Sequence, residues 1–455
     1  MKLGDVSMES FLNAVEKYNG IINDFIWGPP LLILLLGVGI YFSIRLGFPQ
    51  ITKIKAIWKN AFSKKEGKKV KGDISSFQAF LVGLGGIVGS GNIAGVATAV
   101  ASGGPGAFFW MWIAAFFGMA TKFAEITLGI FYRKKKGDGY IGGPMYYLKD
   151  GVKSKFLAGL YAVLAILSYI VIVAMVDTNT IVSTITNKFA ISPWIIGIVL
   201  MIIVGIIIFG GIKKIGKFSS KIVPFMGIFY IASGLLVILF NITEVPNAFA
   251  TIIKAAFTPQ AAFGGFAGAS IAQIIRYGMA RGMYSNEAGL GTAAITHSTA
   301  KVEHPIQQAL WGPVEIFVDT IIVCTITGLV VVISGQWTSG VDGAPLIMSA
   351  FDKTLPGVGS YLVMISSILF SFTCLTSSGF VCEKCSEYLF GEKRKNIIRI
   401  LWLIFIMIGA VTSLELVWDM ADTVNGFLAI PNIIGLFILS GKVVSLKKEY
   451  LDKKE

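Results

Sequence analysis

The sequence predicts an all-α integral membrane protein, and three observations support this fold class. Of the 455 residues, 55% are hydrophobic and 14% are charged, and the mean hydropathy is +0.74. The apolar residues form long runs, and about 20 such residues let a helix cross the ~30 Å hydrocarbon core of a bilayer. The runs also lack the period-two alternation of a membrane β-barrel, whereas helices satisfy their own backbone polar groups in lipid.

About eleven membrane helices are predicted, and the first is an extra N-terminal helix over residues 25–45. Ten core helices follow, at 75–101, 106–132, 156–187, 193–211, 217–241, 265–293, 308–335, 357–388, 396–414 and 418–441. The expected domains are the extra helix with a basic cytoplasmic loop (1–73), a first five-helix repeat (74–241), an extracellular connector (242–264), a second five-helix repeat (265–441) and a cytoplasmic tail (442–455).

The basic residues concentrate in the predicted loops. The net charge is +13, and basic residues concentrate in 45–72, 133–136, 213–217, 393–395 and 447–454. With eleven crossings all of these clusters fall on the same side of the membrane. Since cytoplasmic loops carry the excess of Lys and Arg, the N-terminus is expected outside and the C-terminus in the cytoplasm of a cell membrane. Anionic lipid headgroups, and no nucleic acid, are therefore the expected partners of these bases.

Few residues are available for a catalytic or metal centre. The four cysteines include Cys382 and Cys385, which have the spacing of a metal or redox half-site. No second pair or nearby histidine completes it, so we interpret both as small buried residues. The two histidines, His297 and His304, lie in a polar connector. A membrane-embedded enzyme would need a convincing cluster at one depth, and we therefore expect no enzyme.

The ten core helices divide into five plus five. An odd number of helices per half gives the halves opposite orientations, which is the inverted-repeat design of many secondary transporters. Glycines interrupt the first helix of each half: Gly83, Gly85, Gly86, Gly89 and Gly91 in one, and Gly278, Gly282, Gly289 and Gly291 in the other. Glycine-broken segments at matching positions of two halves indicate a binding site near the bilayer midplane.

The strongest local motif is GGIVGSGN at residues 85–92. Each glycine costs about 1 kcal/mol relative to alanine in a helix interior, so this density favours local unwinding. Unwinding would free carbonyl oxygens for a cation. It would also expose amide groups at the start of a half-helix, where the dipole favours a carboxylate. Close packing of small residues between helices is the alternative interpretation.

A second polar motif, FTCLTSS at residues 372–378, interrupts an apolar run. Single hydroxyls in membrane helices commonly bond back to the previous turn. Several together also suit a hard cation, because hydroxyl and carbonyl oxygens are its preferred neutral ligands. Both interpretations stay open from the sequence.

Longer strings resemble a known family, the alanine or glycine:cation symporters. They are GPGAFFWMW (104–112), FGMATKFAE (117–125), RGMYSNEAGLG (281–291) and DMADTVNG (419–426). VGSGN (88–92) and LTSS (375–378) look like the first and eighth core helices of the leucine-transporter fold. The resemblance spans most of the chain and implies that fold.

The resemblance also implies the ligands of a sodium ion and a substrate. The sodium ligands would be the carbonyls of Gly85, Val88 and Thr373 and the hydroxyls of Thr376 and Ser377. The substrate carboxylate would meet amides near Ser90, Gly91 and Asn92, facing Gln273, Tyr277 and Gly278 of the second half.

Several acidic residues fall inside predicted membrane helices. Asp177 stands where the family often has a neutral amide; it is expected either to meet the substrate ammonium or to lie at the outer water boundary. Lys122 and Glu125 are three residues apart and are expected to pair. Glu315 and Asp319 share a helix face, where gating or a second ion site is possible.

Together these features predict a symporter that couples sodium influx to the uptake of a small amino acid, alanine or glycine. A proton-coupled carrier that uses Asp177 or Glu125 is the alternative within the class. A membrane-embedded enzyme and a channel are the alternatives outside it.

Overall fold

The computed structural model describes residues 17–52, 70–137, 139–259, 270–412 and 414–452. Most of the basic loop predicted within 1–73, part of the connector and the last three residues lie outside these ranges. In the described part, five helices are long and apolar enough to cross a membrane, or eight if each of three bent helix pairs is one span. The chain is thus a multi-pass helical protein.

The first part of the chain runs from the extra helix through six longer helical segments. Helix Lys17–Ile26 bends by 42° into α2 (Pro29–Arg45). In order there follow α3 (Pro49–Thr52), α5 (Ser76–Ile87), η1 (Gly91–Gly95), α6 (Val96–Gly103), α7 (Pro105–Phe131), the hairpin β1 (Lys134–Lys136) and β2 (Gly139–Ile141), α8 (Pro144–Asp150), α9 (Lys155–Leu167), η2 (Ser168–Val173), α10 (Ala174–Thr186), α11 (Pro193–Ile208) and α12 (Gly211–Phe240).

The second part repeats long helices separated by shorter ones. It comprises η3 (Ile242–Glu244), α13 (Val245–Ala256), α14 (Ile271–Asn286), α15 (Ala293–His297), α16 (Pro305–Ala309), α17 (Trp311–Ile316), η5 (Phe317–Cys324), α18 (Thr325–Ser334), η6 (Gln336–Thr338), α19 (Gly343–Thr354), α20 (Gly359–Phe390), η7 (Glu392–Arg394), α21 (Lys395–Val411), α22 (Leu414–Ile438), α23 (Ser440–Lys447) and η8 (Lys448–Asp452). Helices α13 and α19 lie in segments that the sequence predicted only as connectors.

Helices α5 and α14 begin with the same device. Ser75 caps α5 in a reciprocal pair with Gln78, and Ser270 caps α14 with Gln273. Such a capping box satisfies two backbone N–H groups that a helix start would leave open. Both helices then stop near the middle of the protein, α5 at a 51° bend before η1 and α6, and α14 at Glu287 in the left-handed conformation. The predicted interruption of both helices is therefore confirmed.

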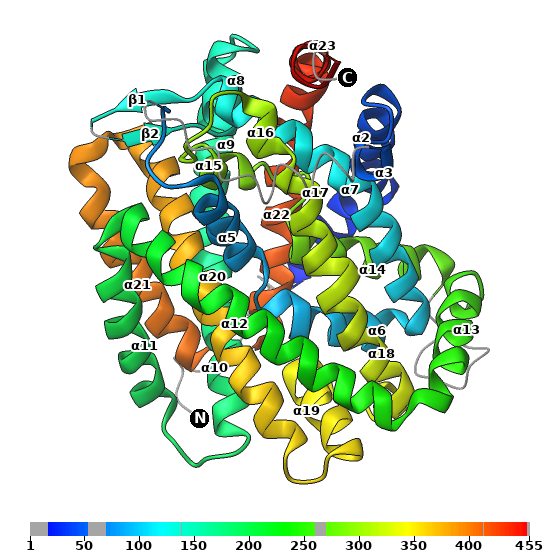
Figure 1. The fold of residues 1–455 in the computed structure, drawn as a ribbon. Helices are drawn as coiled ribbons and strands as arrows, with labels where there is room; N and C mark the ends of the chain where they lie inside the picture. Colours follow the sequence, from blue (N-terminus) through cyan, green and yellow to red (C-terminus); the bar gives the residue numbers. More distant parts are fainter. Residues whose placement is uncertain (1–16, 53–69, 138, 260–269, 413, 453–455) are drawn as a thin grey trace.

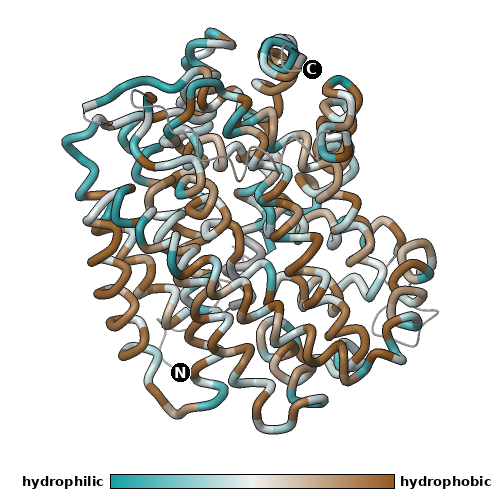
Figure 2. Tube along the Cα trace, viewed as in Figure 1, coloured by the Kyte–Doolittle hydropathy of each residue, from teal (hydrophilic) through white to brown (hydrophobic). Residues whose placement is uncertain are grey.

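The broken helices lie inside a ring of long ones (Figure 1). Helix α14 packs along α7, α5 packs against α12 and α20, and α10 lies against α20 and α21. The outer helices are strongly apolar (Figure 2), and α11 exposes Ile198, Ile202 and Ile206 at one-turn spacing. An apolar stripe on the outside of an already packed protein is the surface expected against lipid.

Basic segments gather at one end of the molecule, the end with β1, β2 and α23 in Figure 1. A pocket of about 310 Å³ there contains Lys136, Lys213, Lys384 and Lys395 around Asp73. Burial raises the pKa of Asp73, and the nearby Lys384 acts in the opposite direction. Clusters far apart in the sequence thus share one end, as the charge pattern predicts.

Candidate functional site

The break after α5 places polar groups at the centre of the helix ring. Val88 is no longer helical, with φ −76° and ψ 89°. The Asn92 Oδ1 accepts the N–H of Gly89 at 2.9 Å, and Asp177 Oδ1 accepts the N–H of Ser90 at 3.0 Å. Side chains therefore replace the helical partners that these amides lose at the break.

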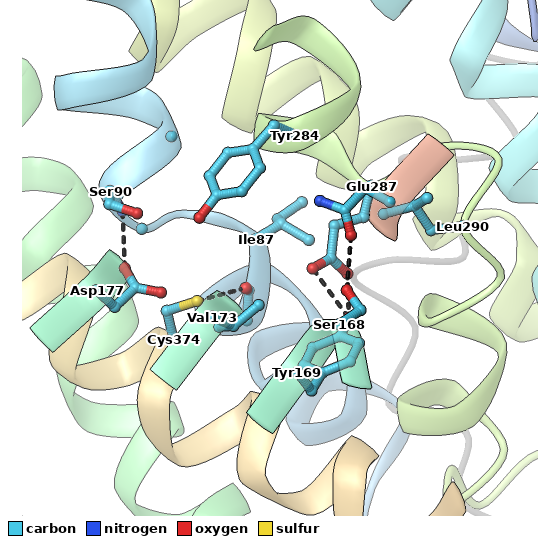
Figure 3. A pocket seen from close by; sticks show the side chains of 14 residues that line it. Ile87, Ser90, Ser168, Tyr169, Val173, Asp177, Tyr284, Glu287, Leu290 and Cys374 are labelled. Carbon is cyan, nitrogen blue, oxygen red and sulfur yellow. Dashed lines mark hydrogen bonds between the residues drawn. The ribbon is translucent and has the colours of Figure 1, made fainter. Parts of the chain in front are cut away.

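A small cavity lies against this break (Figure 3). Its walls come from the end of α5 and the start of η1, from η2 and α10, from the end of α14, and from α20 and α22. The volume is about 20 Å³, which leaves room for roughly one water molecule. Its lining residues include two acidic side chains, Asp177 and Glu287, and no lysine or arginine within the described part of the chain.

Three of the expected substrate residues line this cavity, namely Ser90, Gly91 and Asp177. Asp177 is 1% exposed, so it lies inside the helix ring and not at an outer water boundary. Asn92 is buried and turns the other way: its Nδ2 donates to Asp319 Oδ1 at 2.7 Å. The first half thus places amides and one carboxylate at the cavity.

The other three expected residues lie elsewhere on α14. Gln273 is exposed and serves as the helix cap. A methyl group on Gly278 would overlap the carbonyl of Ala107, and Tyr277 packs beside Gly103. The structure therefore uses these positions to start α14 and to fit it closely onto α6 and α7. The end of α14 contributes Tyr284 and Glu287 to the cavity instead.

The proposed sodium ligands meet where α5 lies on α20. A Cβ atom on Gly85 would lie 3.5 Å from Thr373 Cβ and 3.8 Å from Ser377 Oγ. The Sγ of Cys374 donates to the carbonyl of Gly86 at 3.0 Å. The end of α5 thus packs against neutral side chains of α20, and the Gly86 carbonyl accepts a hydrogen bond from one of them.

The hydroxyls of α20 differ in their partners. Thr373 donates back to the Phe370 carbonyl, and Thr376 back to the Thr373 carbonyl, each at 2.9 Å. The Oγ of Ser377 is buried and has no hydrogen-bond partner among the described residues. Back-bonding therefore accounts for two hydroxyls but not for Ser377. A neutral oxygen set with one orphaned buried hydroxyl fits a sodium ion.

A buried polar cluster adjoins the break on its other side. Asp319 of η5 accepts hydrogen bonds from Asn92, from Ser285 at 2.9 Å and from Thr320 at 2.7 Å. The cluster fixes η1, the end of α14 and η5 relative to one another. Asn92, predicted as a substrate ligand, acts here as the link between these elements.

Buried ion pairs flank the α14 break. Arg281, in α14, binds Asp422 at 2.8 Å. Beyond the break, Lys122 binds Glu315 at 3.1 Å, and Glu315 binds His297 at 2.6 Å; all three side chains are fully buried. The expected pairing of Lys122 with Glu125 is thus wrong, because Glu315 on the facing helix takes the lysine.

Glu125 has a different role. Its Oε1 accepts the N–H groups of Gly289 and Gly291 at 3.0 Å each, and Asn432 Nδ2 donates to it at 2.7 Å. It therefore holds the loop between α14 and α15 from outside the cavity. The carboxylate replaces backbone partners that this loop lacks.

Glu287 and Tyr169 were not identified as site residues from the sequence. Glu287 was visible only as part of the RGMYSNEAGLG string, and Tyr169 as one aromatic residue in an apolar run. The usable signal was an acidic residue between the end of a helix and two glycines.

Two broken helices around a central cavity are the design of a secondary transporter. Solved structures of low sequence identity share this fold. "Crystal structure of MhsT in complex with L-phenylalanine" aligns with a TM-score of 0.60 at 14% identity, covering 82% of this chain and 89% of that one. A Na⁺-coupled sialic acid symporter aligns with a TM-score of 0.54 at 15% identity, covering 92% and 86%.

The sequence comparison then shows the family. The model of the sodium:alanine symporter family matches residues 12–455, and the chain belongs to that family. The sodium/alanine symporter AgcS of Methanococcus maripaludis is 45% identical, over 94% of this chain and 96% of its own. Other relatives are the probable sodium/glutamine symporter GlnT (37% identical, covering 97% and 92%) and the putative sodium/proton-dependent alanine carrier YrbD (36%, covering 95% and 92%), both of Bacillus subtilis. The chain is a transporter of the cation-coupled amino-acid symporter class, not an enzyme.

Proposed function

We propose that this protein is a sodium-driven symporter of a small neutral amino acid, with alanine and glycine as the first candidates. The observation that carries the proposal is the meeting of α5 and α20. The interrupted helix α5 ends there with Gly85 and Gly86 packed against Ser377, whose buried hydroxyl has no hydrogen-bond partner among the described residues. In this site Gly85, Val88, Thr373, Thr376 and Ser377 hold the ion.

The sodium site acts on the substrate site through the α5 break. An ion held by carbonyls on α5 and hydroxyls on α20 draws the two helices together and fixes the unwound segment between them. Ser90 and Gly91 of that segment line the cavity, and the Ser90 N–H donates to Asp177 there. Sodium binding therefore organises the amides that receive the substrate carboxylate. Asp177, which accepts the Ser90 N–H, adjusts when that carboxylate arrives.

The cavity must enlarge before it can hold a substrate. Its volume of about 20 Å³ is less than an amino acid needs, so binding requires side chains such as Tyr284 and Cys374 to withdraw. The ion-pair layers on both sides of the α14 break must then open in turn, Arg281–Asp422 for one side of the membrane and Lys122–Glu315 for the other. One extra N-terminal helix, ten core helices in two inverted halves, an outside N-terminus and the connector at 242–264 complete the proposed topology.

The coupling has enough energy for accumulation. One sodium ion that crosses 100 mV supplies about 2.3 kcal/mol, and a tenfold sodium gradient adds about 1.4 kcal/mol. One-to-one symport of a zwitterion then supports accumulation of roughly a few hundredfold. A proton-coupled carrier is the rival function, and Asp177 is its candidate group at the cavity.

The test is uptake of labelled alanine into proteoliposomes under an inward sodium gradient, compared with an equal potassium gradient. We expect sodium-driven accumulation, and we expect Thr376→Ala combined with Ser377→Ala to abolish it. Ser367→Ala is the matched control, because Ser367 is another buried and unpartnered serine of α20, well away from the α5 break. Uptake that follows a pH gradient and ignores sodium would instead support the proton-coupled carrier.

A further inference from the structure

We infer that Glu287 binds the ammonium group of the transported amino acid, an inference that rests on the proposed function. The ligand class is then an α-amino acid with a free, charged ammonium. The relevant observations are the position of Glu287 at the α14 break, the chemistry of its partners and the charge of the cavity.

The backbone aims this carboxylate at the cavity. Glu287 terminates α14 with φ 54°, in the left-handed region. The loop behind it is held by Glu125, through the amides of Gly289 and Gly291, and by Tyr161, whose hydroxyl donates to the Leu290 carbonyl at 2.8 Å. The direction of the Glu287 side chain is therefore set by a loop fixed from its far side.

The partners of Glu287 are neutral. The hydroxyl of Tyr169 donates to its two oxygens at 3.0 and 2.9 Å, and Thr292 donates to Oε2. No lysine or arginine nitrogen lies within 4.0 Å of it in the described residues, whereas Glu315 and Asp422 each have a basic partner. A carboxylate has about four acceptor positions, so Glu287 keeps capacity for another donor. Lys122 lines one small cavity together with Glu287, but its amino group binds Glu315. A buried carboxylate with no direct basic partner among the described residues is a functional candidate in a membrane protein.

Glu287 and the amide end of the cavity are separate. Figure 3 shows Ser90 and Asp177 on one side and Glu287 with Tyr169 on the other, with Tyr284 and Ile87 between them. A zwitterion placed with its carboxylate at the Ser90 and Gly91 amides therefore directs its ammonium away from those donors and toward Glu287. Asp177 is less suited, because it already accepts the Ser90 N–H at the anion end.

The sodium ion has its own place. A second cavity of about 10 Å³ is lined by Ser377 as well as Glu287, so the carboxylate lies between the proposed sodium ligands and the substrate. The α20 ligands are neutral oxygens, which suit an ion that must be released. The remaining cation of the cargo is the ammonium, and Glu287 supplies the only full negative charge on that side of the main cavity within the described part of the chain.

The test uses thermal unfolding of the purified full-length protein in detergent. One comparison replaces potassium by sodium without an amino acid, and the other adds alanine in the presence of sodium. The wild type is expected to be stabilised in both, and lactate, which has a hydroxyl in place of the ammonium, should not stabilise it. Glu287→Gln should keep the sodium shift and weaken the apparent alanine affinity at least tenfold. Glu287→Asp should restore part of that affinity.

Three other results would overturn the inference. If Glu287→Gln loses both shifts, the residue is a sodium ligand or a structural cap, and the inference is overturned. An unchanged alanine affinity in Glu287→Gln overturns it as well. If the wild type responds to sodium but to none of alanine, glycine or glutamine, the proposed amino-acid transport fails first, and the inference fails with it.

Discussion

Gly83 shows how closely single residues fit in the centre of the protein. A methyl group at this position would overlap the carboxylate of Glu315 and lie 2.8 Å from His297 Nε2. Gly83 lies on α5, which packs directly against this buried cluster. Glycine at this position therefore lets α5 pack directly against Glu315 and His297.

We predict that Gly83→Ala lowers the thermal unfolding temperature. Alanine favours a helix by about 1 kcal/mol over glycine, but overpacking costs about 1–3 kcal/mol and the neighbouring carboxylate is fixed by two bonds. Gly227→Ala on α12 is the matched control, since a Cβ there meets nothing within 4 Å. It should be neutral or stabilising. Equal shifts in both variants would contradict this account.

Site residues are predictable from the sequence when the motif that marks them lies within one short segment. The glycines that break α5 all lie in the short motif at residues 85–92, so the sequence predicts Ser90 and Gly91 as site residues, and both line the cavity. Gln273 was not recognised as a helix cap, although Ser270 three residues earlier is a capping-box signal. The Glu287 carboxylate accepts a hydrogen bond from Tyr169, which is 118 residues away in the sequence. No local sequence pattern predicts a contact between residues so far apart.

At the scale of elements, the buried pair Lys122–Glu315 joins α7 to α17. Removing the lysine leaves the buried Glu315 with His297 as its remaining partner, and breaking a buried ion pair costs about 3–5 kcal/mol. We therefore expect Lys122→Met to destabilise the protein strongly.

The double variant Lys122→Met with Glu315→Gln should recover part of the loss, and a double-mutant cycle of thermal unfolding measures that coupling. Lys395→Gln is the control, because its pair with Glu392 is surface-exposed and such pairs contribute little. Additive effects of the two core substitutions would refute the coupling.

Element positions were predictable wherever apolar runs were long. Helix α7 at Pro105–Phe131 and α20 at Gly359–Phe390 lie within a few residues of the predicted 106–132 and 357–388. Helices α13 and α19 were missed because they are short and amphipathic, and their polar faces looked like connector sequence. Lys122 was paired with Glu125 because spacing along one helix is visible in a sequence, whereas the facing helix is not.

At the scale of the whole molecule, the charge pattern predicts which loops face which side. The loop at Glu303 should be cytoplasmic, and the loop at Ser339 should be external; both residues are exposed. We predict that a membrane-impermeant maleimide labels Ser339→Cys in right-side-out vesicles and Glu303→Cys only in inverted ones. The four native cysteines are buried, so the background should be low. The opposite labelling pattern would reverse the proposed orientation.

Glu287 also has a consequence for engineering. A residue other than glycine in the left-handed conformation costs roughly 1–2 kcal/mol, so the chain tolerates backbone strain to keep an acid at this break. Directed evolution that rewards heat resistance alone would tend to exchange such a residue for one that relaxes the backbone. Selection for thermal stability alone would then yield thermostable variants that no longer bind the substrate. A useful screen must therefore also select for growth on the amino acid.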